Sequence, residues 1–132
     1  MTEAPGEAEQ IVRTFTVEEV EAFARLSKDR GVQHLARDPQ GRLMVHGLLL
    51  ATIPTELGGR WNFLARELQF TFHRPAWTSV PVTCRIRVTR RERTEKGERL
   101  ESEFECRDPE GTLLMEGRAR GLVPHRKPST PG

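Results

Sequence analysis

The second half of the chain alternates apolar and polar residues in four segments, and this alternation limits the fold more than any other feature. In ARELQFTFHRP, Leu68, Phe70 and Phe72 alternate with polar residues, and the same period recurs in VPVTCRIRVTRRE, RLESEFECRD and TLLMEGRARGLVP. A period of two is typical of strands with one buried and one exposed face. Turn residues in EKG (Glu95 to Gly97) and DPEG (Asp108 to Gly111) join the segments, so the sequence predicts an antiparallel sheet.

Two features of the N-terminal region predict a strand that runs into a helix. The segment IVRTFT, from Ile11 to Thr16, has the composition of a short strand. The pattern Thr16-x-x-Glu19 is a capping box, in which a hydroxyl and a carboxylate each accept a free backbone N–H of the other residue. Apolar residues then follow at roughly helical spacing, so we expect a helix from Thr16 to about Lys28.

A second helix is expected to cover the apolar face of the sheet. The segment from Leu43 to Gly59 is mostly apolar and ends at paired glycines, so it predicts a buried helix that begins near His46 or Gly47. Pro54 lies in its interior, where it removes a backbone hydrogen bond and should kink or shorten the helix. Two helices followed by an antiparallel sheet give an α+β fold.

The chain length predicts one domain. With 132 residues, we expect a single domain over residues 11–124 between flexible ends, residues 1–10 and 125–132. Hydrophobic residues make up 36% of the chain and charged residues 30%, so the core is small relative to the surface. A dimer would bury more apolar area, and we expect one.

Charge and cysteine content exclude several classes of function. The net charge of +2 argues against a dedicated nucleic-acid-binding protein. The run from Arg87 to Arg99 mixes both charges and is read as a solvated hairpin, with a weak phosphate-contacting rim as the alternative.

Cys84 and Cys106 lack zinc-binding spacing, so we expect buried free thiols and neither metal nor cofactor. No segment approaches the roughly 20 apolar residues of a membrane span, and we expect a cytoplasmic protein without membrane contact.

Asp29 and His34 are the first candidates for chemistry. They lie five residues apart in a glycine-containing segment after the first helix, where a turn can bring their side chains together. A carboxylate beside an imidazole can orient the ring and position a water molecule for acid–base catalysis. The alternative is a hydrogen bond that only orders the loop.

His46 and Gly47 lie at the expected start of the buried helix. Free N–H groups point outward there, and a glycine lets a ligand approach the backbone closely. Such a position can stabilise negative charge on a carbonyl oxygen, as an oxyanion hole does. For His46 alone, the alternative is a half-buried residue that caps the helix.

Three segments resemble the MaoC-like dehydratases and (R)-specific enoyl-CoA hydratases. They are FTVEEVEAFARLSKDRGVQH, LMVHGLLLA, and FHRP followed by alternating strands. The family signature is roughly F-x-x-x-D-V-x-x-F-A-x-L-S-G-D-x-N-P-x-H, then V-H-G-M, then F-x-x-P. The resemblance covers the chain from Phe15 to about Pro124 and implies a hot-dog fold, in which an antiparallel sheet wraps around a central helix.

The resemblance also implies roles for individual residues. Asp29 and His34 match the catalytic pair that holds the water added to, or removed from, a trans-2-enoyl thioester. Gly47 matches the glycine whose N–H polarises the thioester carbonyl. An acyl thioester, on CoA or an acyl-carrier protein, would therefore be the substrate. The residues expected to bind it in a tunnel at the dimer interface, with arginines at a phosphate-binding rim, are His46, Leu48, Phe70, Phe72, Arg74 and Arg85.

The sequence departs from the family pattern at three places. Gly31-Val32 replaces the Asn-Pro pair, Ser79-Val80 replaces a Gly-Asp pair, and the segment between His34 and Val45 is shorter. A non-catalytic acyl-thioester-binding subunit, in a heterodimer with a related subunit, is therefore an alternative to a homodimeric hydratase.

A hot-dog thioesterase is a second alternative. Thioesterases of this fold place a carboxylate on or near the central helix, whereas this chain offers His46 and the distant Glu56 there. This argues against a thioesterase. Because hot-dog domains host several activities, the fold alone does not decide among the three functions.

Overall fold

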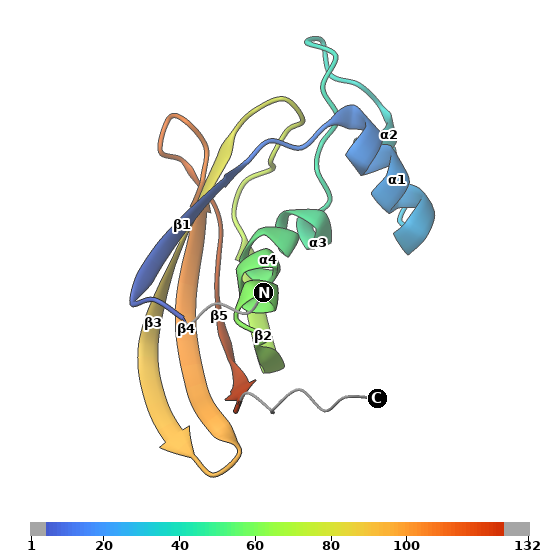
Figure 1. Ribbon diagram of the computed structural model, residues 1–132. Helices are drawn as coiled ribbons and strands as arrows, with labels where there is room; N and C mark the ends of the chain where they lie inside the picture. Colours follow the sequence, from blue (N-terminus) through green and yellow to red (C-terminus); the bar gives the residue numbers. More distant parts are fainter. Residues whose placement is uncertain (1–4, 126–132) are drawn as a thin grey trace.

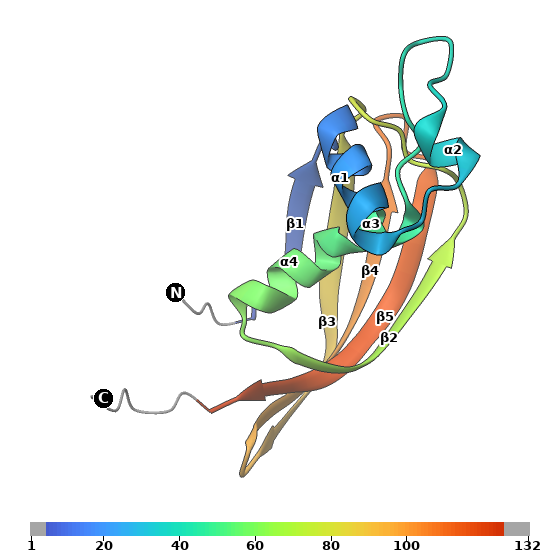
Figure 2. The same ribbon diagram turned by 90° about the vertical axis from the view of Figure 1, so that its right-hand side faces the viewer.

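A computed structural model describes residues 5–125, which form a five-stranded antiparallel sheet around a helix. The strand order is β1-β3-β4-β5-β2. The strands are β1 (Ala8–Arg13), β2 (Leu64–Phe72), β3 (Val82–Thr94), β4 (Gly97–Arg107) and β5 (Leu113–Pro124). The helices are α1 (Val17–Ser27), α2 (Val32–Leu35), α3 (Gly47–Leu50) and α4 (Thr52–Arg60). The sheet curves around α4, and α1 and α2 lie beyond the end of this central helix that α3 forms (Figures 1 and 2).

β1 begins earlier than the sequence predicts. Residues Ala8, Glu9 and Gln10 pair with β3, so the boundary predicted at residue 11 falls inside a strand. The remaining predictions of flexible ends concern residues 1–4 and 126–132, which lie outside the described residues. His125, the first residue of the predicted tail, donates its N–H to the Lys96 carbonyl (3.1 Å).

The predicted capping box forms at the start of α1. The Thr16 hydroxyl accepts the Glu19 N–H (3.1 Å), and the Glu19 carboxylate accepts the Thr16 N–H (2.9 Å). This backbone hydrogen bond from Thr16 holds the pKa of the Glu19 carboxyl below its ordinary value. The helix ends at Ser27, because Lys28 has a left-handed backbone conformation (φ 64°).

The central helix is interrupted at Ala51, which separates α3 from α4. Pro54, in the first turn of α4, has no N–H and its ring crowds the carbonyl four residues earlier, which accounts for the predicted kink. The paired glycines do not end the helix as predicted. Gly58 and Gly59 lie inside α4, which continues to Arg60.

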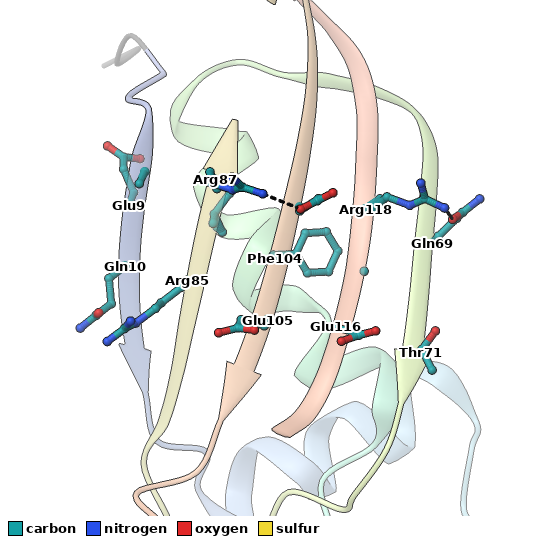
Figure 3. A pocket seen from close by; sticks show the side chains of 14 residues that line it. Glu9, Gln10, Gln69, Thr71, Arg85, Arg87, Phe104, Glu105, Glu116 and Arg118 are labelled. Atoms are coloured by element: carbon teal, nitrogen blue, oxygen red, sulfur yellow. Dashed lines mark hydrogen bonds and ion pairs between the residues drawn. The ribbon is translucent and has the colours of Figure 1, made fainter. Parts of the chain in front are cut away.

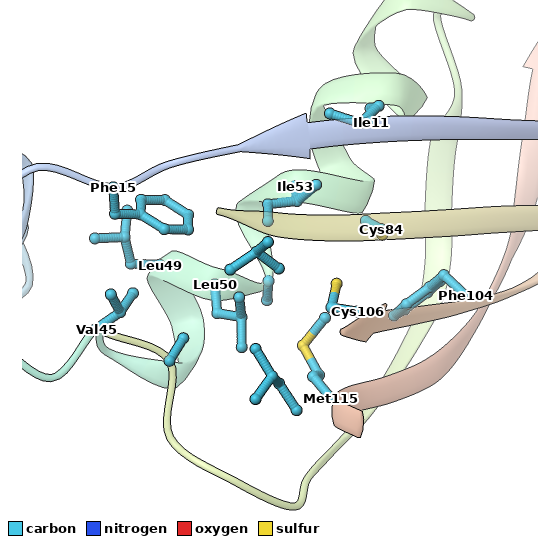
Figure 4. Close-up of a cluster of buried hydrophobic side chains, with 14 of the residues drawn as sticks. Ile11, Phe15, Val45, Leu49, Leu50, Ile53, Cys84, Phe104, Cys106 and Met115 are labelled. Carbon is cyan, nitrogen blue, oxygen red and sulfur yellow. The ribbon is translucent and has the colours of Figure 1, made fainter. Parts of the chain in front are cut away.

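The core lies between the helix and the inner face of the sheet (Figure 4). Phe15, Ile53 and Met115 are fully buried there. Cys84 and Cys106 face each other directly across β3 and β4 as free, fully buried thiols, as predicted. A hydrogen bond with Cys106, together with burial, raises the pKa of the Cys84 thiol.

β2 forms one edge of the sheet and is poorly covered. Every residue of β2 except Phe70 is exposed. β5 is its only hydrogen-bonded strand neighbour within residues 5–125. Unpaired, apolar strand edges invite association with another chain.

Among residues 5–125, none of the helices has the length and apolar character needed to cross a membrane.

Candidate active site

Hydrogen bonds to nearby backbone groups hold Asp29 in the loop after α1. The Ser27 hydroxyl donates to the Phe23 carbonyl (2.7 Å) and accepts the Asp29 N–H (3.1 Å). One carboxylate oxygen of Asp29, Oδ1, accepts the Gly31 N–H (3.3 Å). The side chain is 55% exposed, so the other oxygen, Oδ2, can meet a solvent molecule or a substrate.

His34 lies on α2 and turns its Nε2 atom toward Asp29. Its Nδ1 is 2.9 Å from the Met44 carbonyl oxygen. Because a carbonyl oxygen only accepts, Nδ1 carries the proton, and Nε2 of the neutral ring carries a lone pair. Nε2 lies 3.9 Å from Asp29 Oδ2. The structure therefore brings together the two residues predicted to form a pair.

The gap between these two atoms suits a shared water molecule. A separation of 3.9 Å is too long for a direct hydrogen bond. It is short enough for one water molecule to contact both atoms, and water-mediated bonds of this kind are nearly as favourable as direct ones. Both atoms can accept a proton from that water.

His46 contacts both members of the pair. Its Nε2 lies 2.9 Å from the backbone carbonyl oxygen of Asp29, so Nε2–H is the donor. The His46 ring stacks on the His34 ring, with centroids 3.8 Å apart and planes 15° from parallel, and the edge of Phe23 packs against it. Only 1% of His46 is exposed. Its placement favours positioning of the pair over the substrate contact predicted from sequence.

The same three side chains are a poor metal site, although their ligand atoms lie within 4.8 Å of one another. Imidazole binds a metal through a lone pair in the plane of its ring. The rings of His34 and His46 are nearly parallel and stacked, so their lone pairs do not converge on one point. One nitrogen of each ring also donates to a backbone carbonyl. This geometry favours acid–base chemistry.

Gly47 begins α3 directly after His46. An N–H at the first position of a helix has no acceptor within the helix. A Cβ atom on Gly47 would lie 3.1 Å from ring carbons of Phe72, so the absence of a side chain lets this ring cover the glycine. Gly47 and Phe72, both predicted site residues, therefore lie in contact range.

A cavity of about 220 Å³ lies between α4 and the inner face of the sheet. Thr55 and Gly58 of α4 line one side, and Phe70 and Phe104 line the other. The Phe70 ring centroid is 6.2 Å from that of Phe72, and the Phe72 ring lies against Gly47. Of the predicted acyl-binding residues, Phe70 lines this cavity, and its acyl-binding role stays a prediction.

Arg74 and Arg85 lie in different surroundings. Arg74 lies in the loop that follows β2, and its backbone N–H donates to the Leu114 carbonyl. Two residues later in this loop, the Ala76 carbonyl accepts the Val45 N–H (2.8 Å). The loop that carries Arg74 is thus joined to the residue before His46, and Arg74 itself is exposed. Arg85 is exposed on the outer face of the sheet, in a charged hollow, with α4 behind the strands (Figure 3). The sheet separates it from Gly47, so Arg85 is no part of the site proposed below.

Leu48 is 65% exposed. It follows Gly47 on α3, so it lies beside the site, but within one chain it does not line an enclosed tunnel. The predicted role of Leu48 therefore depends on a second chain that would cover it.

Sequence reasoning missed the backbone groups and the aromatic contact that hold the pair. The Met44 carbonyl, the Asp29 carbonyl and the Phe23 ring carry no signal of this role in the sequence. The cavity had a signal, because two consecutive glycines inside a helix each cost about 1 kcal/mol relative to alanine. Gly58 and Gly59 instead suggested the end of the helix.

Comparisons with known proteins place the fold. No protein-family model matches the sequence, and no curated protein matches it significantly. Among solved structures, the (R)-hydratase from A. caviae involved in PHA biosynthesis has a TM-score of 0.78 and 26% identity, with coverage of 90% of this chain and 96% of that one. The MaoC-like dehydratase from Rhodospirillum rubrum has a TM-score of 0.74 and 14% identity, with coverage of 94% of both chains.

A third neighbour belongs to a complex. The C-terminally truncated HadBC complex, a 3R-hydroxyacyl-ACP dehydratase from Mycobacterium tuberculosis, matches with a TM-score of 0.68 and 14% identity, over 92% of this chain and 98% of that one. The fold and the site together define a hot-dog protein with an Asp/His pair beside its central helix. The predicted resemblance to the MaoC-like dehydratases and (R)-hydratases is confirmed by these neighbours.

Proposed function

We propose that the protein catalyses the reversible hydration of trans-2-enoyl thioesters to 3-hydroxyacyl thioesters. The observation that carries this proposal is the 3.9 Å separation of Asp29 Oδ2 and His34 Nε2, two acceptor atoms that can share one water molecule. His34 stacks on His46, the residue directly before Gly47. The similarity to an (R)-hydratase of 26% identity supports the same reaction class.

The pair would activate water for addition to the β-carbon. His34 Nε2 accepts a proton from the water while Asp29 Oδ2 accepts its other hydrogen bond. The oxygen bonds to the β-carbon, and the electron pair of the double bond moves toward the thioester oxygen. The proton taken from the water is returned to the α-carbon, so that H and OH have added across the double bond. The dehydration reverses these steps.

The Gly47 N–H would stabilise the negative charge on the thioester oxygen. A backbone donor that is already in place stabilises such charge without reorganisation during the reaction. The acyl chain would pass Phe72 and Phe70 into the cavity beside α4. Arg74, in the exposed loop after β2, would meet a phosphate of CoA or of a carrier protein.

A non-catalytic subunit of a heterodimer is the second candidate. One observation favours it: Gly31 caps α2 without any side-chain hydrogen bond, and Val32 beside it is 77% exposed. These two residues replace the Asn-Pro pair of the family pattern. The HadBC neighbour is a complex. Such a subunit would bind acyl thioesters without turnover.

A direct assay distinguishes the candidates. We expect the absorbance of the conjugated enoyl group of crotonyl-CoA to fall on addition of the protein, without release of free thiol. A thioesterase would release the CoA thiol instead. Binding of a saturated acyl-CoA with no change in crotonyl-CoA absorbance would contradict the hydratase and favour the subunit.

We also propose that two chains join through β2. On this edge strand the apolar residues Leu64, Leu68 and Phe72 are between 43% and 57% exposed. Light scattering at micromolar concentration is expected to give twice the mass of one chain. Leu68→Asp should yield monomers, because a carboxylate would be buried in the interface. Val12→Asp on the opposite edge strand β1 is the matched control, since Val12 is 59% exposed. A wild-type monomer, or dissociation by both variants alike, would contradict this interface.

The proposed location is the cytoplasm. Cys84 and Cys106 face each other across adjacent strands as free thiols. Reducing compartments keep such thiols free, which supports this location.

A further inference from the structure

Three large apolar side chains are exposed on the segment that carries the candidate pair. Leu26, in the last turn of α1, is 81% exposed, and Val32 and Leu35 of α2 are 77% and 44% exposed. Val32 and Leu35 are three residues apart on a helix and share one of its sides, whereas His34 is buried. The two helices lie side by side (Figures 1 and 2). Exposed apolar side chains that lie close together on a surface indicate a place where another molecule binds.

The same segment carries an excess of positive charge. Residues 25–37 contain one carboxylate, that of Asp29, and four basic residues, all exposed, which are Arg25, Lys28, Arg30 and Arg37. Among residues 5–125, none of these four forms an ion pair. Together with the three apolar side chains, they define what we call the α1–α2 surface.

Elsewhere the protein neutralises its own charges. On the outer face of the sheet, Arg87 pairs with Glu103 (3.0 Å), as Figure 3 shows, and Arg120 pairs with Glu67 (3.0 Å). Charges of that kind are satisfied without another molecule. The basic residues of the α1–α2 surface are not, so they favour a partner that carries carboxylates or phosphates.

The apolar side chains decide between these two groups. Phosphates of free CoA would meet the basic residues but would leave Leu26, Val32 and Leu35 in water. An acidic amphipathic helix of a second protein fits both features, because its apolar side chains would cover these three residues and its carboxylates would meet the basic ones. Asp29 and His34 lie on the same segment, so a protein bound here would stand beside the candidate pair.

We infer that the α1–α2 surface docks an acyl-carrier protein through an acidic amphipathic helix of the carrier, and that the thioester substrate arrives on this carrier. The inference rests on the proposed function, because it names the carrier of the same substrate. The surface would bind the protein part of the carrier, and the phosphopantetheine arm would bring the enoyl group to Asp29 and His34. Charge attraction would speed the encounter, and the apolar contact would slow dissociation.

The test compares one enoyl group on three carriers. Crotonyl is attached to a purified acidic bacterial acyl-carrier protein, to CoA, and to pantetheine, which has neither protein nor phosphate. We expect the highest kcat/KM with the carrier protein. Arg25→Glu should lower this value about tenfold, within the range of electrostatic steering, and Leu26→Ser should lower it about tenfold through the lost apolar contact.

Both variants should turn over crotonyl-pantetheine as the wild type does. The two side chains are exposed, and neither takes part in the hydrogen bonds that hold Asp29 and His34. Calorimetric binding of the carrier protein loaded with butyryl, which cannot be hydrated, measures docking without turnover. We expect this affinity to fall in both variants by about the same factor as kcat/KM.

Two matched controls carry similar changes away from the α1–α2 surface. Arg93→Glu reverses an exposed charge near the tip of the β3–β4 hairpin, at the opposite end of the molecule from α1 (Figure 2). Val12→Ser removes an apolar side chain of β1 that is 59% exposed. Both control variants should keep the wild-type kcat/KM and affinity for the loaded carrier protein.

Several results would overturn the inference. They are equal values for the wild type and both surface variants, no binding of the loaded carrier protein by the wild type, and a higher kcat/KM with CoA than with the carrier protein. A changed mass of either surface variant in light scattering would assign the surface to contact between two copies of the chain. Binding to phosphatidylglycerol vesicles that both surface variants lose would assign it to a membrane. Weaker binding of the carrier protein by the variants, without turnover of any crotonyl thioester, would retain the docking surface and reject the hydratase.

Discussion

Asp29→Asn and His34→Ala are each expected to lower the rate of enoyl-thioester hydration by about 10²–10⁴-fold, the usual contribution of positioned acid–base groups. Asp29→Asn replaces an acceptor oxygen by an amide group, and His34→Ala removes the lone pair on Nε2. Neither side chain is assigned to hold the acyl chain, so the affinity for a saturated acyl-CoA should change far less. Stopped-flow or steady-state absorbance with crotonyl-CoA measures the rate, and calorimetry measures the affinity.

The double variant tests whether the pair acts as one unit. Because both residues bind the same water molecule, removal of the second should cost little once the first is gone. Glu21→Gln is the matched control, since it makes the same change from carboxylate to amide at an exposed position of α1. Near-normal rates in the single variants, or a loss in the double variant equal to the product of both single losses, would contradict a shared water molecule.

The strands and helices were predictable because their signals are local. Period-two alternation identified the four long strands, and the Thr16 capping box identified the first residue of α1. The face of each strand residue follows from the same alternation. Cys84 and Ile86 point inward, so Arg85 between them must point outward. The alternation in the sequence therefore already predicted that Arg85 lies on the face of the sheet opposite Gly47.

The support of the site was not predictable, because it depends on backbone atoms from separate loops. The pairing of Asp29 with His34 follows from their spacing and from family resemblance. In contrast, the Met44 carbonyl that fixes the tautomer of His34 and the Asp29 carbonyl that binds His46 depend on how two loops meet in space. No property of the side chain at position 44 indicates such a role. Leu48 is 65% exposed, and neither the sequence nor one chain shows whether another molecule covers it.

The buried His46 offers a prediction that separates positioning from stability. Its hydrogen bond to the Asp29 carbonyl and its stack on His34 join the two halves of the pair. His46→Phe keeps an aromatic ring for the stack and removes the donor. It also removes Nδ1, which is buried and unpaired among the described residues, so part of the lost hydrogen bond is offset in the free energy of unfolding.

We therefore expect His46→Phe to lower kcat by about 10²-fold, the effect of a displacement of about 1 Å in a catalytic group, with a much smaller change in the midpoint of thermal unfolding. KM and the affinity for a saturated acyl-CoA should stay close to the wild-type values, because His46 does not face the acyl cavity. His46→Gln carries an amide donor near the position of Nε2 and should recover part of the lost rate. If kcat falls only in proportion to thermal stability, or if His46→Phe retains full activity, His46 does not position Asp29 and the stack with His34 is only structural.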